Sequence, residues 1–130
     1  MSYDSTSQDN DTIELRVPAD HAFASTVRLI VASLAADAGF TLDDLDDIRL
    51  AVNEVFTCAV VTAGTRSATV TVRFDATTSD LVAHIGVDDA PIELDDLAGS
   101  IIRSAVDHVC IDERQVTLVK YRRPSAPADR

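Results

Sequence analysis

The sequence has 130 residues, of which 46% are hydrophobic, and it carries 22 acidic against 11 basic side chains. A chain of this length and apolar content fits one globular domain. Its net charge of −11 repels phosphate backbones and anionic lipids, which argues against nucleic-acid and membrane binding and favours a basic protein surface as partner. The same charge also keeps proteins soluble, so charge alone does not decide between these interpretations.

Both ends of the chain are predicted to be disordered tails that flank one domain at residues 12–122. Residues 1–11 are rich in Ser, Asp, Thr and Asn and have no apolar run, and residues 123–130 are similar. No stretch approaches the roughly 18 apolar residues of a transmembrane helix. Cys58 and Cys110 lack metal-ligand spacing, which favours reduced thiols. We therefore expect a soluble, cytoplasmic protein.

The first part of the domain predicts a strand followed by a helix. Thr12–Val17 alternates apolar and polar side chains, as a half-buried strand does, and Pro18 ends it. Asp20 can cap a helix of about five turns that ends before Gly39, where a left-handed conformation is favoured. The apolar positions of this helix step by three and four residues: Ala24, Val27, Val31, Leu34 and Ala38.

Polar residues mark the start of a second helix. Thr41 followed by Asp44 resembles a capping box with Asp in place of Glu. Asp43, Asp46 and Asp47 add negative charge at the positive end of the helix dipole. The cluster could also be interpreted as a metal site, but the chemistry of a helix start explains it with fewer assumptions.

This second helix carries the most informative stretch of the chain, residues 47–61. Glu54 and Cys58 lie four residues apart and form a polar stripe beside the apolar face. A carboxylate there must protonate, find a partner or line a cleft, unless it is simply a boundary residue that reaches solvent. The apolar face itself consists of Leu45, Ile48, Val52, Val55 and Ala59.

Strand patterns, a loop and a further helix complete the chain after Gly64. Two alternating strands, joined by the short polar link 75–80, predict an antiparallel hairpin. An acidic loop at 88–96 precedes a third helix, and a final strand is expected at 115–121. The strand faces are Ala68, Val70, Val72 and Phe74, and Leu81, Ala83, Ile85 and Val87; the helix positions are Leu97, Ile101, Ala105 and Val109, with Ala98, Ile102 and Val106 beside them.

This order of elements predicts an α+β fold, a two-layer sandwich with a mainly antiparallel sheet and three helices on one face. No glycine-rich phosphate-binding motif occurs in the sequence. His21, His84 and His108 are scattered over different elements, so we interpret them as ordinary surface or boundary residues.

The stretch DIRLAVNEVFTCAV at residues 47–60 resembles the N-box helix of the anti-sigma-factor serine kinases. These kinases form a branch of the GHKL superfamily, whose ATPase domains have the Bergerat, or histidine-kinase-like, fold. The segments IRSAVDHV at 102–109 and VTLVK at 116–120 are similar to the last helix and closing strand of the family. The resemblance extends from Ile13 to about Lys120.

The resemblance also implies roles for individual residues. In the family a Glu activates the attacking hydroxyl or water, and an Asn four residues later binds magnesium; Glu54 matches the Glu, but Cys58 replaces the Asn. A neutral thiol is a poor ligand for a hard cation. Asp88 matches the family's adenine-binding Asp, while Ala90 and Ile92 occupy positions that are glycine in the family.

The chain also departs from the family in length, because Asp88 is followed within ten positions by Ala98, our match for the last glycine of the family's closing turn. Family members carry a mobile ATP lid of tens of residues in this interval. We therefore expect a shortened or absent lid, no metal site, and no ATP or Mg²⁺ as cofactor.

By resemblance, we expect a regulator of transcription that is not an active enzyme and that binds two partners directly, a sigma factor and an anti-anti-sigma antagonist. The family also implies a homodimer. The first alternative is an active ATP-dependent serine kinase that phosphorylates the antagonist with Glu54 as base. The second is an α+β module with an unrelated small ligand.

Overall fold

Five strands form one antiparallel sheet in the computed structural model, which describes residues 10–123. The strand order is β1-β2-β3-β5-β4. The strands are β1 (Asn10–Pro18), β2 (Thr69–Thr77), β3 (Asp80–Val87), β4 (His108–Ile111) and β5 (Val116–Tyr121). Residues 1–9 and 124–130, which make up most of the two predicted tails, lie outside the described residues.

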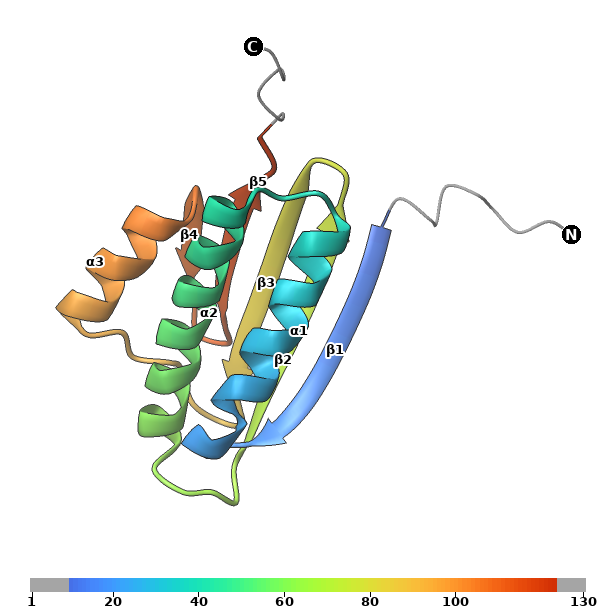
Figure 1. Ribbon diagram of the computed structural model, residues 1–130. Coiled ribbons are helices and arrows are strands. Elements are labelled where there is room, and N and C mark those ends of the chain that lie inside the picture. The colour runs from blue at the N-terminus through green and yellow to red at the C-terminus, as the bar shows by residue number, and fades with distance from the viewer. Residues whose placement is uncertain (1–9, 124–130) are drawn as a thin grey trace, which may run out of the picture.

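The helices lie on one face of this sheet (Figure 1). They are α1 (Ala24–Asp37), α2 (Leu42–Ala63) and α3 (Asp96–Ala105), and the 3₁₀ turn η2 (His21–Phe23) precedes α1. The predicted two-layer α+β sandwich is therefore confirmed. None of the helices within residues 10–123 combines the length and the apolarity needed to cross a membrane.

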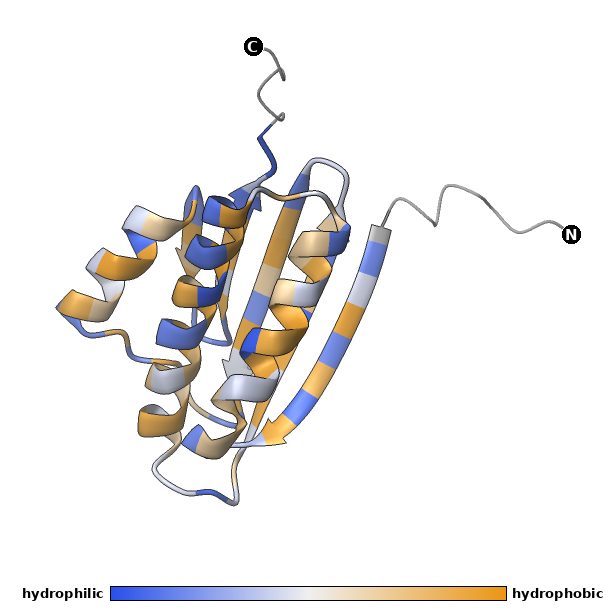
Figure 2. Cartoon of the chain, in the orientation of Figure 1, coloured by the Kyte–Doolittle hydropathy of each residue, from blue (hydrophilic) through white to orange (hydrophobic). Residues whose placement is uncertain are grey.

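Alternating side chains build the core between the two layers. Figure 2 shows hydrophobic and hydrophilic residues alternating along β1. Val70, Val72 and Phe74 of β2 are fully buried, and so are Val55 and Phe56 of α2. Fully burying one large apolar side chain between the layers stabilises the fold by roughly 1.5–3 kcal/mol. The predicted core face of β3 and most of those of α2 and β2 are confirmed, whereas Leu45 of α2 and Ala68, which precedes β2, are only partly buried.

The residues predicted to begin and end the helices do so in the structure, with one difference at the start of α1. Gly39 and Gly64 adopt φ of +89° and +69° after α1 and α2, the left-handed conformation that favours glycine. Asp20 accepts a hydrogen bond from the N–H of Ala22 at 2.9 Å, and it thereby caps the 3₁₀ turn instead of the α-helix. The α-helix consequently has 14 residues and is shorter than the five turns expected.

The second helix begins with half of a capping box. Thr41 Oγ1 accepts a hydrogen bond from the N–H of Asp44 at 3.1 Å. The Asp44 side chain does not return to Thr41; it is buried and lies 3.6 Å from the ammonium of Lys120, which also lies 3.5 Å from Asp47 and donates to the carbonyl of Ala105 at 2.8 Å. This cluster joins α2, β5 and the end of α3.

The prediction was wrong about the end of α3. The helix stops at Ala105, and Val109, together with His108 and Cys110, belongs to the additional strand β4. Leu97 is 71% exposed, because the buried face of α3 is the neighbouring one, formed by Ala98, Gly99, Ile102 and Ala105. The hairpin link is also shorter than predicted, since β2 continues to Thr77.

Candidate functional site

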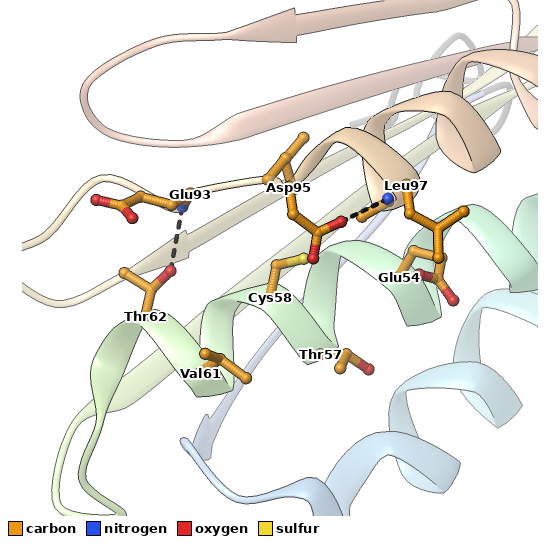
Figure 3. Close-up of a pocket in the computed structure, with 10 residues that line it drawn as sticks. Glu54, Thr57, Cys58, Val61, Thr62, Glu93, Asp95 and Leu97 are labelled. Atoms are coloured by element: carbon orange, nitrogen blue, oxygen red, sulfur yellow. Dashed lines mark hydrogen bonds between the residues drawn. The ribbon is translucent and has the colours of Figure 1, made fainter.

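A cavity of about 540 Å³ lies between the C-terminal half of α2 and the start of α3 (Figure 3). The α2 residues that line it recur on one side of the helix, which the apolar stripe on the opposite side fixes against the sheet. Its lining consists of Glu54, Thr57, Cys58, Val61, Thr62, Glu93, Leu94, Asp95, Leu97 and Ala98. The structure therefore brings Glu54 and Cys58, which the spacing placed on one stripe of the helix, to one cavity, the cleft-lining alternative of the sequence analysis.

Among residues 10–123, three carboxylates line this cavity, and no Lys, Arg or His does. They are Glu54 from α2 and Glu93 and Asp95 from the loop before α3. Within residues 10–123, neither Glu54 nor Glu93 forms an ion pair, and Asp95 Oδ1 accepts a hydrogen bond from the N–H of Ala98 at 2.8 Å. The local field in the cavity is negative and repels anionic groups.

The Cys58 thiol is buried next to these carboxylates. Burial raises the pKa of this thiol, and the negative charges of Asp95 and Glu54 raise it further, while a hydrogen bond from the Asp95 backbone N–H opposes them. Cys58 is consequently a neutral thiol at pH 7. A neutral thiol does not suit Mg²⁺, which prefers oxygen ligands, and the resemblance matches Cys58 to the family's metal ligand.

Asp88 does not line the cavity. Its carboxylate accepts a hydrogen bond from the N–H of Thr69 at 3.1 Å, and it borders a separate groove with Arg73 and Arg114 on the other face of the sheet. Ile92 is 4% exposed and belongs to the hydrophobic core. The adenine-binding role of Asp88 thus stays a prediction that its position does not favour.

The loop at 88–95 leads from β3 directly into α3. Thr62 Oγ1 accepts a hydrogen bond from the N–H of Glu93 at 3.1 Å, and Asp95 is the N-cap residue of α3 (Figure 3). Both contacts fix the loop against the helices. Within residues 10–123, no additional segment between β3 and α3 could act as a lid over the cavity.

Sequence analysis missed Glu93, Asp95 and Leu97 as cavity residues, because it treated the interval 88–96 only as an acidic loop. Asp95 did carry a signal, since an Asp placed three residues before Ala98 is a typical N-cap pattern. An N-cap residue fixes the first turn of its helix and the end of the preceding loop. In this chain that segment carries the side chains that face α2 across the cavity. In the described part of the chain, no group of three or more His, Cys, Asp or Glu side chains could hold a metal ion.

The chain is similar to serine-protein kinases named RsbW. It is 40% identical to the protein of Bacillus velezensis, 46% to that of Halalkalibacterium halodurans and 44% to that of Staphylococcus aureus, each over 50 residues. These matches cover 38% of this chain and 31% of each relative. The chain therefore matches less than a third of the length of these relatives.

The fold agrees with a solved structure. The crystal structure of the RsbU and RsbW domains of Rv1364c from Mycobacterium tuberculosis superposes with a TM-score of 0.63 at 19% identity, over 91% of this chain and 34% of that chain. Residues 17–100, well over half of the sequence, match the histidine kinase-like ATPase domain family, and this segment contains both Glu54 and Cys58. The resemblance inferred from the second helix is thereby confirmed, and the chain belongs to the histidine kinase-like ATPase domain family.

Proposed function

We propose that this chain is an anti-sigma-type regulator of transcription that acts by binding proteins and does not bind ATP. Membership of the ATPase domain family and the similarity to RsbW kinases support the regulatory class. The resemblance stated for residues 47–60 supplies the proposed partners, a sigma factor and an anti-anti-sigma antagonist, as well as a homodimer. Action on sigma factors implies a cytoplasmic location.

The observation that carries the loss of ATP binding is the chemistry of the cavity. The phosphates of ATP require backbone N–H donors, cationic side chains or a metal ion. Here the lining offers Glu54, Glu93 and Asp95 and no cationic side chain. The N–H of Ala98 at the N-terminus of α3 is already bound to Asp95, so this carboxylate occupies the place of an anionic ligand.

Two further features support the same proposal. Cys58 stands where the family has its magnesium-binding Asn, and its thiol is buried and neutral. The loop at 88–95 enters α3 directly, without a segment that could cover phosphates. Because phosphoryl transfer depends on positioned metal and phosphate contacts, the combined loss abolishes the reaction. Neither ATP nor Mg²⁺ is then a cofactor.

Titration calorimetry with ATP and Mg²⁺ tests this proposal. We expect no saturable heat from the wild-type chain at millimolar nucleotide, with an RsbW kinase titrated in parallel as the positive control. Cys58→Asn alone restores no binding, because the carboxylates and the short loop persist. Micromolar binding that depends on Mg²⁺ would contradict the proposal.

The alternative function is an active serine kinase, and one observation favours it: Glu54 is retained in the cavity and has no ion-pair partner within residues 10–123. A transfer assay with labelled ATP and candidate antagonists separates the two functions. An active kinase loses transfer in the Glu54→Gln variant. Our proposal expects no transfer from either wild type or variant, with partner inhibition preserved in both.

A further inference from the structure

We propose that the cavity beside Glu54 receives an arginine side chain of a protein partner, presented by a segment that is apolar on both sides of the arginine. The inference deepens the proposed function and rests on it, because a nucleotide would occupy the same space. It names the chemistry that a partner must have at this site.

The charges of the cavity favour a cationic ligand. Glu54 is half-buried, and its surroundings in the lining contribute two more carboxylates and no positive charge. Only Glu54 is partly shielded from solvent, whereas Glu93 and Asp95 are exposed, and together the three negative charges attract a cation. Elsewhere on the same helix, the buried carboxylate of Asp44 has the ammonium of Lys120 at 3.6 Å. Within residues 10–123 no cationic side chain lines the cavity in this way, so a cation that binds there is supplied by a partner.

The rim of the cavity indicates that this cation is carried by a protein segment. Val61 of α2 and Leu97 of α3 are 69% and 71% exposed, although both are large apolar residues. They come from two different helices and border the same cavity, with Asp95 and Cys58 between them in Figure 3. An isolated small cation would leave these side chains exposed, whereas apolar neighbours of a bound arginine would cover them.

Arginine fits better than lysine or a metal ion. Its planar guanidinium has five N–H donors and can bridge two carboxylates at once, while its stem packs on apolar side chains. A volume of about 540 Å³ accommodates this side chain together with an apolar neighbour. Within residues 10–123, no three ligand side chains are grouped for a metal ion. An acidic or phosphorylated segment would be repelled.

The test uses ¹⁵N-labelled full chain and three capped peptides: Leu-Ala-Arg-Leu-Leu, the same peptide with neutral citrulline in place of Arg, and the same peptide with Glu. We expect the Arg peptide to shift the amide signals of Val61, Thr62, Leu94 and Leu97 saturably. The citrulline peptide binds at least about tenfold more weakly, since the charge-assisted hydrogen bonds are lost. The Glu peptide does not bind.

Matched variants locate the effect. Glu54→Gln and Asp95→Asn each weaken the Arg peptide about fivefold or more, and Asn preserves the helix cap. Glu113→Gln removes the same charge from an exposed turn outside the cavity and leaves the affinity unchanged. Equal affinity for Arg and citrulline peptides, shifts outside the cavity, or no binding of any peptide at millimolar concentration would overturn the inference.

A titration of the same sample with ATP and Mg²⁺ distinguishes the two possible failures. Saturable nucleotide binding at the cavity signals contradicts the proposed function and this inference together. If ATP shifts no amide signals and the Arg and citrulline peptides bind equally well, the inference is contradicted and the proposed function is not.

Discussion

The carboxylates at the start of α2 have a cationic partner within the chain, whereas the carboxylate in its C-terminal half has none within residues 10–123. Near the N-terminus, Asp44 and Asp47 lie 3.6 and 3.5 Å from the ammonium of Lys120, which also donates to the carbonyl of Ala105. In the C-terminal half, Glu54 shares a cavity with Glu93 and Asp95, and no cationic side chain within residues 10–123 lines that cavity. One end is compensated within the chain, and the other is not.

This difference separates a structural role from a binding role. A buried charge that lacks its partner costs several kcal/mol, so the Lys120 cluster has to be complete for the layers to pack. The cavity carboxylates reach solvent and can stay unpaired until a partner arrives. The compensated cluster at the start of α2 therefore supports the fold, and the uncompensated carboxylates of the cavity are where we propose that a partner binds.

The largest expected effect comes from breaking the compensated end. Lys120→Met leaves Asp44 buried without a cation, and we expect the free energy of unfolding to fall by about 3 kcal/mol. Urea denaturation measures the loss. The double variant Lys120→Met with Asp44→Leu should recover most of it, because the buried charge is removed as well.

A loss below about 1 kcal/mol in Lys120→Met would show that the cluster is not needed for packing, since exposed pairs contribute no more than that. Glu54→Gln provides the matched change at the other end of α2. We expect it to leave the free energy of unfolding nearly unchanged, because the carboxylate there has no partner to lose.

A smaller effect is expected on the reactivity of Cys58. Its pKa is raised by burial and then by Asp95 and Glu54, so little thiolate forms at pH 8 and iodoacetamide should alkylate it far more slowly than the exposed Cys110. Removing a charge in Glu54→Gln lowers the pKa, which increases the thiolate fraction and the alkylation rate by about twofold.

Peptide mass spectrometry after timed alkylation follows both thiols in one sample. Glu113→Gln serves as the control, since Glu113 is distant in sequence and outside the cavity. An equal rate in wild type and Glu54→Gln would mean that Glu54 exerts no field on the thiol, and the negative character assigned to the cavity would be wrong.

Another effect concerns the loop that lines the cavity. Thr62→Val keeps the shape of the side chain but removes the acceptor for the Glu93 N–H, and we expect a loss of about 1 kcal/mol. Hydrogen exchange at the Glu93 amide should accelerate at the same time. An unchanged exchange rate would show that Thr62 does not hold the loop.

Much of the fold was predictable because its signals are local. The apolar spacing of α2 and the alternation of β2 and β3 directly report which side faces the core. The end of α3 was not predictable, because no Gly or Pro stops it. The helix ends where Lys120 binds the carbonyl of Ala105 and where Asp107 donates its N–H to Val119, and both are contacts with a distant strand.

The site was predictable only in part, for the same reason. Glu54 and Cys58 lie on one helix, so their spacing was enough to place them together. Glu93 and Asp95 reach the cavity through the cap of α3 and the bond to Thr62, which bring separate segments together. Asp88 matched the family by sequence position, but its carboxylate accepts a hydrogen bond from the N–H of Thr69 at the start of β2 and does not line the cavity.

Binding to sigma factors from the same organism, in EDTA and over a series of salt concentrations, tests the central claim most directly. We expect immobilised chain to capture a sigma factor without nucleotide, with an association rate that falls as salt shortens the Debye length to about 3 Å near 1 M, while the dissociation rate changes less. Capture that is absent in EDTA and appears only when Mg²⁺ and ATP are added would contradict the account.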